Sequence, residues 1–179
     1  MRWKWLLVAI FLSLHYSAWA GEASPYVGQE RREIKALSKE EVGGYLSGDG
    51  MGFAKAAELN HYPGPKHVLL LAERLQLSDE QRARTETIFQ KMKDQAVSLG
   101  KQLVEKERLL DARFAAANIS SNELEQLVIE VSVIQGQIRA AHLQAHIAER
   151  AVLTADQLVR YDALRGYEIS GAHGQHNGH

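Results

Sequence analysis

The sequence predicts an all-α protein built on a long antiparallel helical hairpin flanked by two short helices, and three observations support this prediction. Residues 66–165 contain no proline and only two glycines, so helix-breaking residues are nearly absent there. Serine or threonine followed three residues later by glutamate or glutamine, the pattern of a capping box, marks three helix starts in this stretch, at Ser78, Ser120 and Thr154. Two long segments between these boxes carry apolar residues at spacings of three and four, the period of one buried helical face.

The first twenty residues have the pattern of a secretory signal peptide. Arg2 and Lys4 make a positive start, residues 6–14 are almost entirely apolar, and residues 18–20 read Ala-Trp-Ala, a small-x-small cleavage site. The apolar stretch is too short for a membrane-spanning helix, which needs about 20 residues. We therefore expect cleavage after Ala20 and export, to the periplasm in a bacterium. An uncleaved segment would instead anchor the protein to the membrane.

Glycine and proline divide the rest of the chain into three parts. Residues 21–65 carry most of the 14 glycines and all three prolines, and we expect an irregular arm with short helices at 40–46 and 53–59. Residues 66–165 form the helical-hairpin domain. Residues 166–179 are rich in glycine and histidine, which predicts a flexible tail.

Capping boxes set the helix boundaries inside the hairpin domain. In each box the hydroxyl accepts a hydrogen bond from a backbone N–H of the first turn, and the glutamate or glutamine returns to the N-cap amide. The boxes pair Ser78 with Gln81, Ser120 with Glu123, and Thr154 with Gln157. These boundaries predict helices at about 66–76, 79–117, 121–152 and 155–165.

The two long helices are expected to pack against each other, because a short link at 118–120 turns the second back along the first. The apolar stripe of the first consists of Ile88, Met92, Ala96, Leu99, Leu103, Leu110 and Phe114. That of the second consists of Leu127, Val131, Ile134, Ile138, Ala141, Ala145, Ala148 and Val152. Helices arranged in this way enclose only a thin core, so we expect burial to be completed by pairing as a homodimer.

Two copies of one short motif carry a family resemblance. Leu77 to Gln81 and Leu153 to Gln157 both read Leu-Ser/Thr-x-x-Gln and open helices at the two ends of the hairpin segment. Behind a secretory signal, this pair resembles the LTxxQ family of periplasmic proteins, which contains the Spy/CpxP chaperones, the zinc-resistance-associated proteins and the nickel and cobalt sensors. The resemblance covers about residues 62–165. It implies a curved all-helical dimer without enzymatic activity that acts in envelope stress, as an ATP-independent holdase or as a binder of divalent metal.

Histidines are the feature that separates these two roles. His142 and His146 are four residues apart on the second long helix, so their rings lie on one face, a workable two-ligand site for Zn²⁺, Ni²⁺, Co²⁺ or Cu²⁺. The alternative interpretation is a pair of partly exposed polar residues at a helix interface. The antiparallel register brings the pair level with Asp94, and the helix at 66–76 must fold back, which brings His67 to nearly the same height. The predicted metal site therefore consists of His67, His142, His146 and a carboxylate from Asp94 or Glu86.

The tail offers a second group of histidines. His173, His176 and His179 are spaced by three among glycines, a composition that gathers borderline cations with little selectivity. A solvated tail without a role explains the same composition, and the sequence leaves both interpretations open.

Composition and motifs exclude several classes of function. The chain has no cysteine, so disulfides and thiolate sites are absent, and 21 Lys+Arg against 22 Asp+Glu leave no basic excess for nucleic acid. No nucleophile elbow, phosphate loop, dinucleotide fingerprint or H-E-x-x-H occurs, so we expect no enzymatic activity.

The sequence predicts a periplasmic envelope-stress protein that binds divalent metal through histidines in metal sensing or resistance. The alternative is a Spy/CpxP-like holdase with incidental histidines, and the expected partners are metal ions, unfolded proteins, a membrane sensor or an anti-sigma protein.

Overall fold

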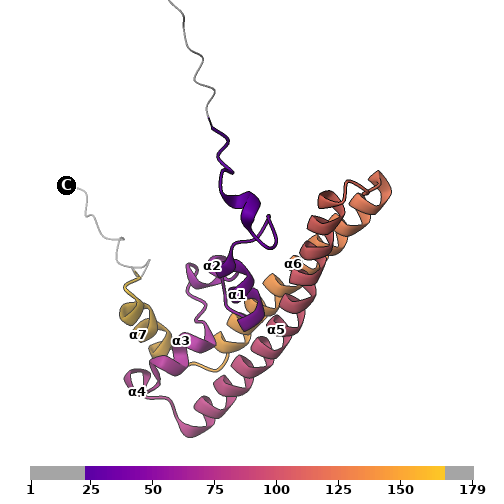
Figure 1. Cartoon of the computed structure of the whole chain (residues 1–179). Coiled ribbons are helices and arrows are strands. Elements are labelled where there is room, and N and C mark those ends of the chain that lie inside the picture. The colour runs from indigo at the N-terminus through magenta and orange to yellow at the C-terminus, as the bar shows by residue number, and fades with distance from the viewer. Residues whose placement is uncertain (1–22, 168–179) are drawn as a thin grey trace, which may run out of the picture.

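The computed structural model describes residues 23–167 and contains helices and loops but no strand over that range (Figure 1). The elements are a 3-10 turn η1 (Gln29–Arg31) and the helices α1 (Lys39–Ser47), α2 (Lys55–Glu58), α3 (Pro65–Leu70), α4 (Ala72–Leu75), α5 (Asp79–Ala115), α6 (Ser121–Arg150) and α7 (Ala155–Arg165). The predicted all-α fold is confirmed. The signal peptide predicted at 1–20 and the tail histidines lie outside the described residues. Within residues 23–167, none of the helices has the length and apolarity needed to cross a bilayer.

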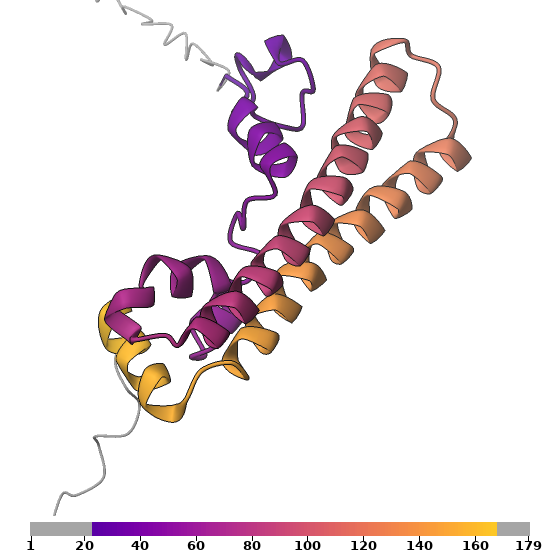
Figure 2. The ribbon, with the colours of Figure 1, turned by 90° about the horizontal axis from the view of Figure 1, so that it is seen from below.

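Helices α5 and α6 form the predicted antiparallel hairpin, and the short helices α3, α4 and α7 gather at the end away from its turn (Figures 1 and 2). Ion pairs between Lys106 and Glu130 (2.5 Å) and between Arg113 and Glu123 (2.8 Å) link the two long helices. Most of the predicted stripe is buried. Phe114 is an exception at 57 % exposure, because α5 ends one residue later and nothing covers its last turn.

The turn of the hairpin begins earlier than predicted. Helix α5 ends at Ala115, and Ala117 adopts a left-handed φ of 50°, which stops the helix. Ser120 caps α6 by accepting a hydrogen bond from the backbone N–H of Glu123 (3.3 Å). The return half of this capping box does not form, because the Glu123 carboxylate pairs with Arg113 instead.

The two Leu-Ser/Thr-x-x-Gln motifs clasp each other at the base of the hairpin. Both capping boxes form as predicted, at Ser78 with Gln81 and at Thr154 with Gln157. The two glutamine amides also exchange hydrogen bonds, with the Gln81 Nε2 donating to Gln157 Oε1 (2.7 Å) and the Gln157 Nε2 donating to Gln81 Oε1 (3.0 Å). A buried cluster of Val68, Leu75, Leu153 and Tyr161 lies beside this clasp. The motif therefore ties the start of α5 to the start of α7.

The single helix predicted at 66–76 is divided into α3 and α4. Leu71 leaves helical geometry, with φ −103° and ψ 10°, and Gln76 then ends α4 in the left-handed region at φ 55°. Val68, Ala72 and Leu75 nevertheless remain buried, so both pieces contribute to the core at the base.

The arm is a structural part of the hairpin domain. Helix α1, predicted at 40–46, begins with a capping box formed by Ser38 and Glu41. Ile34, Leu37 and Tyr45 are buried in one cluster with hairpin residues. At Gly100 the backbone of α1 lies so close to α5 that a Cβ would stand 2.1 Å from the Tyr45 carbonyl oxygen. Glycine is therefore required where α1 crosses α5. This crossing fixes the segment that follows α1, which lines the site described next.

Candidate metal site

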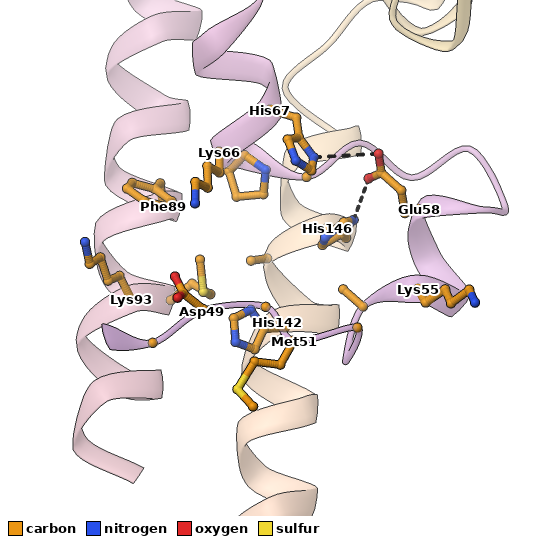
Figure 3. Close-up of a pocket in the computed structure, with 18 of the residues that line it drawn as sticks. Asp49, Met51, Lys55, Glu58, Lys66, His67, Phe89, Lys93, His142 and His146 are labelled. Carbon is orange, nitrogen blue, oxygen red and sulfur yellow. Dashed lines mark ion pairs between the residues drawn. The ribbon is translucent and has the colours of Figure 1, made fainter. Parts of the chain in front are cut away.

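A pocket of about 390 Å³ lies between the arm and the hairpin, and it brings three of the predicted site residues together. His67 enters from α3, and His142 and His146 enter from successive turns of α6 (Figure 3). The loop between α1 and α2 closes another side of the pocket. The α6 histidines take part in the hairpin packing, since His142 is 4 % and His146 is 9 % exposed.

His146 is oriented for binding through its Nε2 atom. Its Nδ1 lies 2.8 Å from the backbone carbonyl oxygen of Tyr62, a contact in which the ring nitrogen must donate, so the lone pair is on Nε2. Gly64 borders the space in front of that atom. A Cβ at Gly64 would lie 3.1 Å from His146 Nε2 and 3.5 Å from His67 Nδ1. Because glycine has no side chain, the space that both imidazoles face stays open.

The carboxylate of this site comes from Glu58 at the end of α2. Its Oε1 accepts hydrogen bonds from the Tyr161 hydroxyl (2.8 Å), the Tyr167 hydroxyl (3.0 Å) and Arg165 Nε (3.1 Å). Its Oε2 is buried, has no hydrogen-bond partner and lies 3.7 Å from His146 Nδ1. His67 Nδ1 lies 3.7 Å from Oε1 (Figure 3). Three donors thus hold Oε1, and Oε2 is left without a donor beside His146.

The surroundings of His142 and His67 lower the pKa of both side chains, which favours the neutral imidazole. Burial, followed by the neighbouring His146, lowers the pKa of His142. Burial also lowers the pKa of His67, with Arg165 acting in the same direction. The His142 ring stacks on Phe53, with centroids 6.2 Å apart, and its buried Nε2 has no hydrogen-bond partner. A neutral imidazole with a free nitrogen lone pair is the form that binds a metal ion.

The two carboxylates expected from the sequence do not lie in this pocket. Asp94 is exposed and accepts a hydrogen bond from Gln90 Nε2 (2.7 Å), and Glu86 is exposed on the same helix. The helix register predicted how far along α5 these two residues lie, but not which side of α5 they face. Phe89 and Met92 face the pocket from α5 instead. Sequence reasoning missed Glu58, whose only signal was its position near the end of a short predicted helix, shortly before the sharp Tyr-Pro-Gly-Pro turn.

The donors are gathered without forming a closed coordination sphere. Within the described range, no three His, Cys, Asp or Glu side chains have the mutual arrangement that holds a metal ion. The chemistry of the donors nevertheless fits a transition metal, because imidazole nitrogen and carboxylate oxygen are ordinary ligands for such ions. The unpartnered Glu58 Oε2 and His67 Nδ1 are buried polar atoms that a cation would satisfy. Small side-chain movements are therefore needed to complete the site.

Comparison with known protein families identifies a match. A family model described as heavy-metal resistance matches residues 50–160, a range that runs from the loop lining the pocket into α7. It includes Glu58 and all three histidines of the pocket. Neither the curated proteins nor the solved structures gave a match.

Proposed function

The chain belongs to the heavy-metal resistance family, one of the Spy/CpxP-like LTxxQ type, and on this premise we propose that it binds a divalent transition metal ion in metal sensing or resistance. The ligands are Glu58 Oε2, His67 and His146, and His142 adds a further nitrogen one turn away on α6. Zn²⁺, Ni²⁺, Co²⁺ and Cu²⁺ all accept this combination of nitrogen and oxygen donors. Membership in the family suggests a role in metal handling, and the pocket supplies the chemistry for it.

One observation carries this proposal. Glu58 presents a buried oxygen, Oε2, that has no hydrogen-bond partner and lies 3.7 Å from the His146 ring. Its other oxygen is held by three donors from α7 and the residues after it, and lies 3.7 Å from His67 Nδ1. A buried carboxylate oxygen without a partner is costly, and a bound cation would offset that cost. Because Glu58 lies on the arm and His146 on the hairpin, a metal ion held by both would also link these two parts of the fold.

We further propose that the protein acts in the periplasm, without enzymatic activity, as a homodimer. A second apolar stripe on α6 supports the dimer, because its residues follow one another at spacings of four and three, as in a coiled-coil seam. The residues are Ile129, Val133, Gly136, Ala140, Leu143 and Ile147. Ile129, Val133 and Ile147 are each more than half exposed. A second copy of α6 would bury this stripe.

The alternative function is an ATP-independent holdase. Exposed apolar side chains near the tip of the hairpin favour it, since Phe114 is 57 % and Val128 is 45 % exposed. Such a surface suits loose capture of unfolded chains. The two functions differ in what they require of the pocket, because capture at the tip does not depend on Glu58.

Calorimetric titration of Zn²⁺, Ni²⁺ and Cu²⁺ tests the metal proposal. The protein starts at Gly21 and carries glutamine in place of the three tail histidines, so that the tail does not contribute. We expect Glu58→Gln and His146→Ala to weaken binding by about tenfold or more, and the matched control Glu86→Gln to leave it unchanged. Equal affinities in all variants would overturn the proposal. Absence of binding together with suppression of aggregation of a model client would favour the holdase.

A further inference from the structure

The same pocket is also lined by two methionine side chains, Met51 and Met92. The chain has three methionines and no cysteine, and both methionines other than Met1 line this pocket. Met51 comes from the loop between α1 and α2, and Met92 comes from α5. Thioethers are soft donors that prefer monovalent copper to zinc or nickel. The histidines predicted from the sequence thus account for only part of the donors in the pocket.

Met51 is held in place by features that hydrophobic burial does not explain. The residue is 40 % exposed, so the core gains little from it. Its backbone adopts a left-handed φ of 42°, which is costly for a residue other than glycine. Its Sδ lies against α1, 2.6 Å from the position that a Cβ on Gly44 would occupy. Glycine at position 44 therefore makes room for the thioether.

His142 provides a nitrogen donor near this thioether. Figure 3 shows Met51, His142 and Asp49 at the end of the pocket away from Glu58. The His142 side chain is almost fully buried, stacks on Phe53 and has an Nε2 atom without a hydrogen-bond partner. This end of the pocket therefore differs chemically from the end that contains Glu58 and His67.

The charge of this region favours a cation of single charge. Asp49 contributes one carboxylate, which the Ser47 hydroxyl fixes by donating a hydrogen bond of 2.8 Å. The thioethers carry no charge, and the ammonium group of Lys93 borders this end of the pocket (Figure 3). Repulsion between this ammonium group and a bound ion is half as large for a monovalent ion as for a divalent one.

We propose that this end of the pocket is a separate site for a soft monovalent cation, copper(I) or silver(I), held by the thioethers of Met51 and Met92 and by His142 Nε2. The proposal deepens the metal-handling function and rests on it. It shares His142 with the divalent site but uses the two thioethers in place of Glu58, His67 and His146. One pocket would then receive borderline divalent ions at one end and soft monovalent ions at the other.

Silver ion is the probe, because it is soft and monovalent and needs no reductant. The protein starts at Gly21, carries glutamine in place of the tail histidines, and is labelled with ¹³C at the methionine methyl groups. We expect addition of Ag⁺ to shift the methyl resonances of both Met51 and Met92. We also expect Met51→Leu and Met92→Leu each to lower the Ag⁺ affinity by about tenfold while leaving the Zn²⁺ affinity within about twofold.

Glu58→Gln provides the converse control. It should lower the Zn²⁺ affinity and leave the Ag⁺ affinity nearly unchanged, because the carboxylate is not a ligand of the soft site. Methyl resonances that do not respond to Ag⁺, or leucine variants that bind Ag⁺ as tightly as the parent, would overturn this inference. If Zn²⁺ binding still depended on Glu58 in that case, the proposed function would stand. Met51 is exposed and Met92→Leu conserves volume, so both variants are expected to fold.

Discussion

Glu149 gives a quantitative prediction about stability. Its side chain on α6 is fully buried, its Oε1 accepts a hydrogen bond from the Thr85 hydroxyl (2.8 Å), and its Oε2 has no hydrogen-bond partner. Burial raises the pKa of this carboxyl from 4.5 to about 7, although Thr85 and Arg84 act in the opposite direction. The folded protein therefore retains a proton on Glu149 at pH values at which the unfolded chain has released it.

The sign and size of the effect follow from this difference in pKa. Between about pH 4.5 and 7 the unfolded state binds fewer protons at Glu149 than the folded state, so stability falls as the pH rises through this window and then levels off. The stability that Glu149 contributes below the window is lost above it. A difference of about 2.5 pKa units corresponds to about 3 kcal/mol of unfolding free energy.

Glu149→Gln removes the ionisation and keeps an oxygen for Thr85. Urea unfolding at pH 4 and pH 8 should show that the parent loses about 3 kcal/mol more than the variant over this interval. Glu86→Gln is the matched control, since Glu86 is exposed on α5, and it should leave the pH dependence as in the parent. The same change between pH 4 and pH 8 in the parent and in Glu149→Gln would refute this reasoning.

Three further substitutions test the packing, the pocket and the association. Gly100→Ala places a Cβ 2.1 Å from the Tyr45 carbonyl oxygen, so thermal unfolding should show a loss of about 3 kcal/mol, and an unchanged melting temperature would contradict this crossing of α1 and α5. Gly64→Ala fills the space 3.1 Å from His146 Nε2 and should weaken Zn²⁺ binding in calorimetry, which a parent-like affinity would disprove. Val133→Asp puts a charge on the exposed stripe of α6 and should shift the protein to monomer in sedimentation, whereas an undisturbed dimer would exclude this surface.

The helices were predictable because their signals are local. A capping box requires only residues three apart, and those at Ser78 and Thr154 form as the sequence indicates. The box at Ser120 forms only in part, because Glu123 meets Arg113 across the turn, a contact that no local pattern contains. Ala148 was predicted as part of the buried stripe of the second long helix, but it is exposed. The next residue, Glu149, is buried in its place.

The periodic spacing of residues along the helices predicted only part of the site. His142 and His146 share a face because of their spacing, and α3, which folds back along the hairpin, brings His67 to the same pocket. The carboxylate and the thioether belong to Glu58 and Met51 on the arm, where the sequence has no regular period. Their positions depend on how the backbone of α1 crosses α5 at Gly100, and this long-range contact cannot be derived from the spacing of residues along the chain.

Anomalous diffraction from crystals of the protein soaked with one equivalent of Zn²⁺ would locate the bound ion directly. We expect a single strong peak in the space beside Gly64, within about 2.2 Å of Glu58 Oε2 and of a ring nitrogen of His67 and of His146. The same crystals of Glu58→Gln should show the peak weakened. A zinc ion bound elsewhere on residues 23–167, with the three side chains unchanged, would show that Glu58, His67 and His146 are not its ligands.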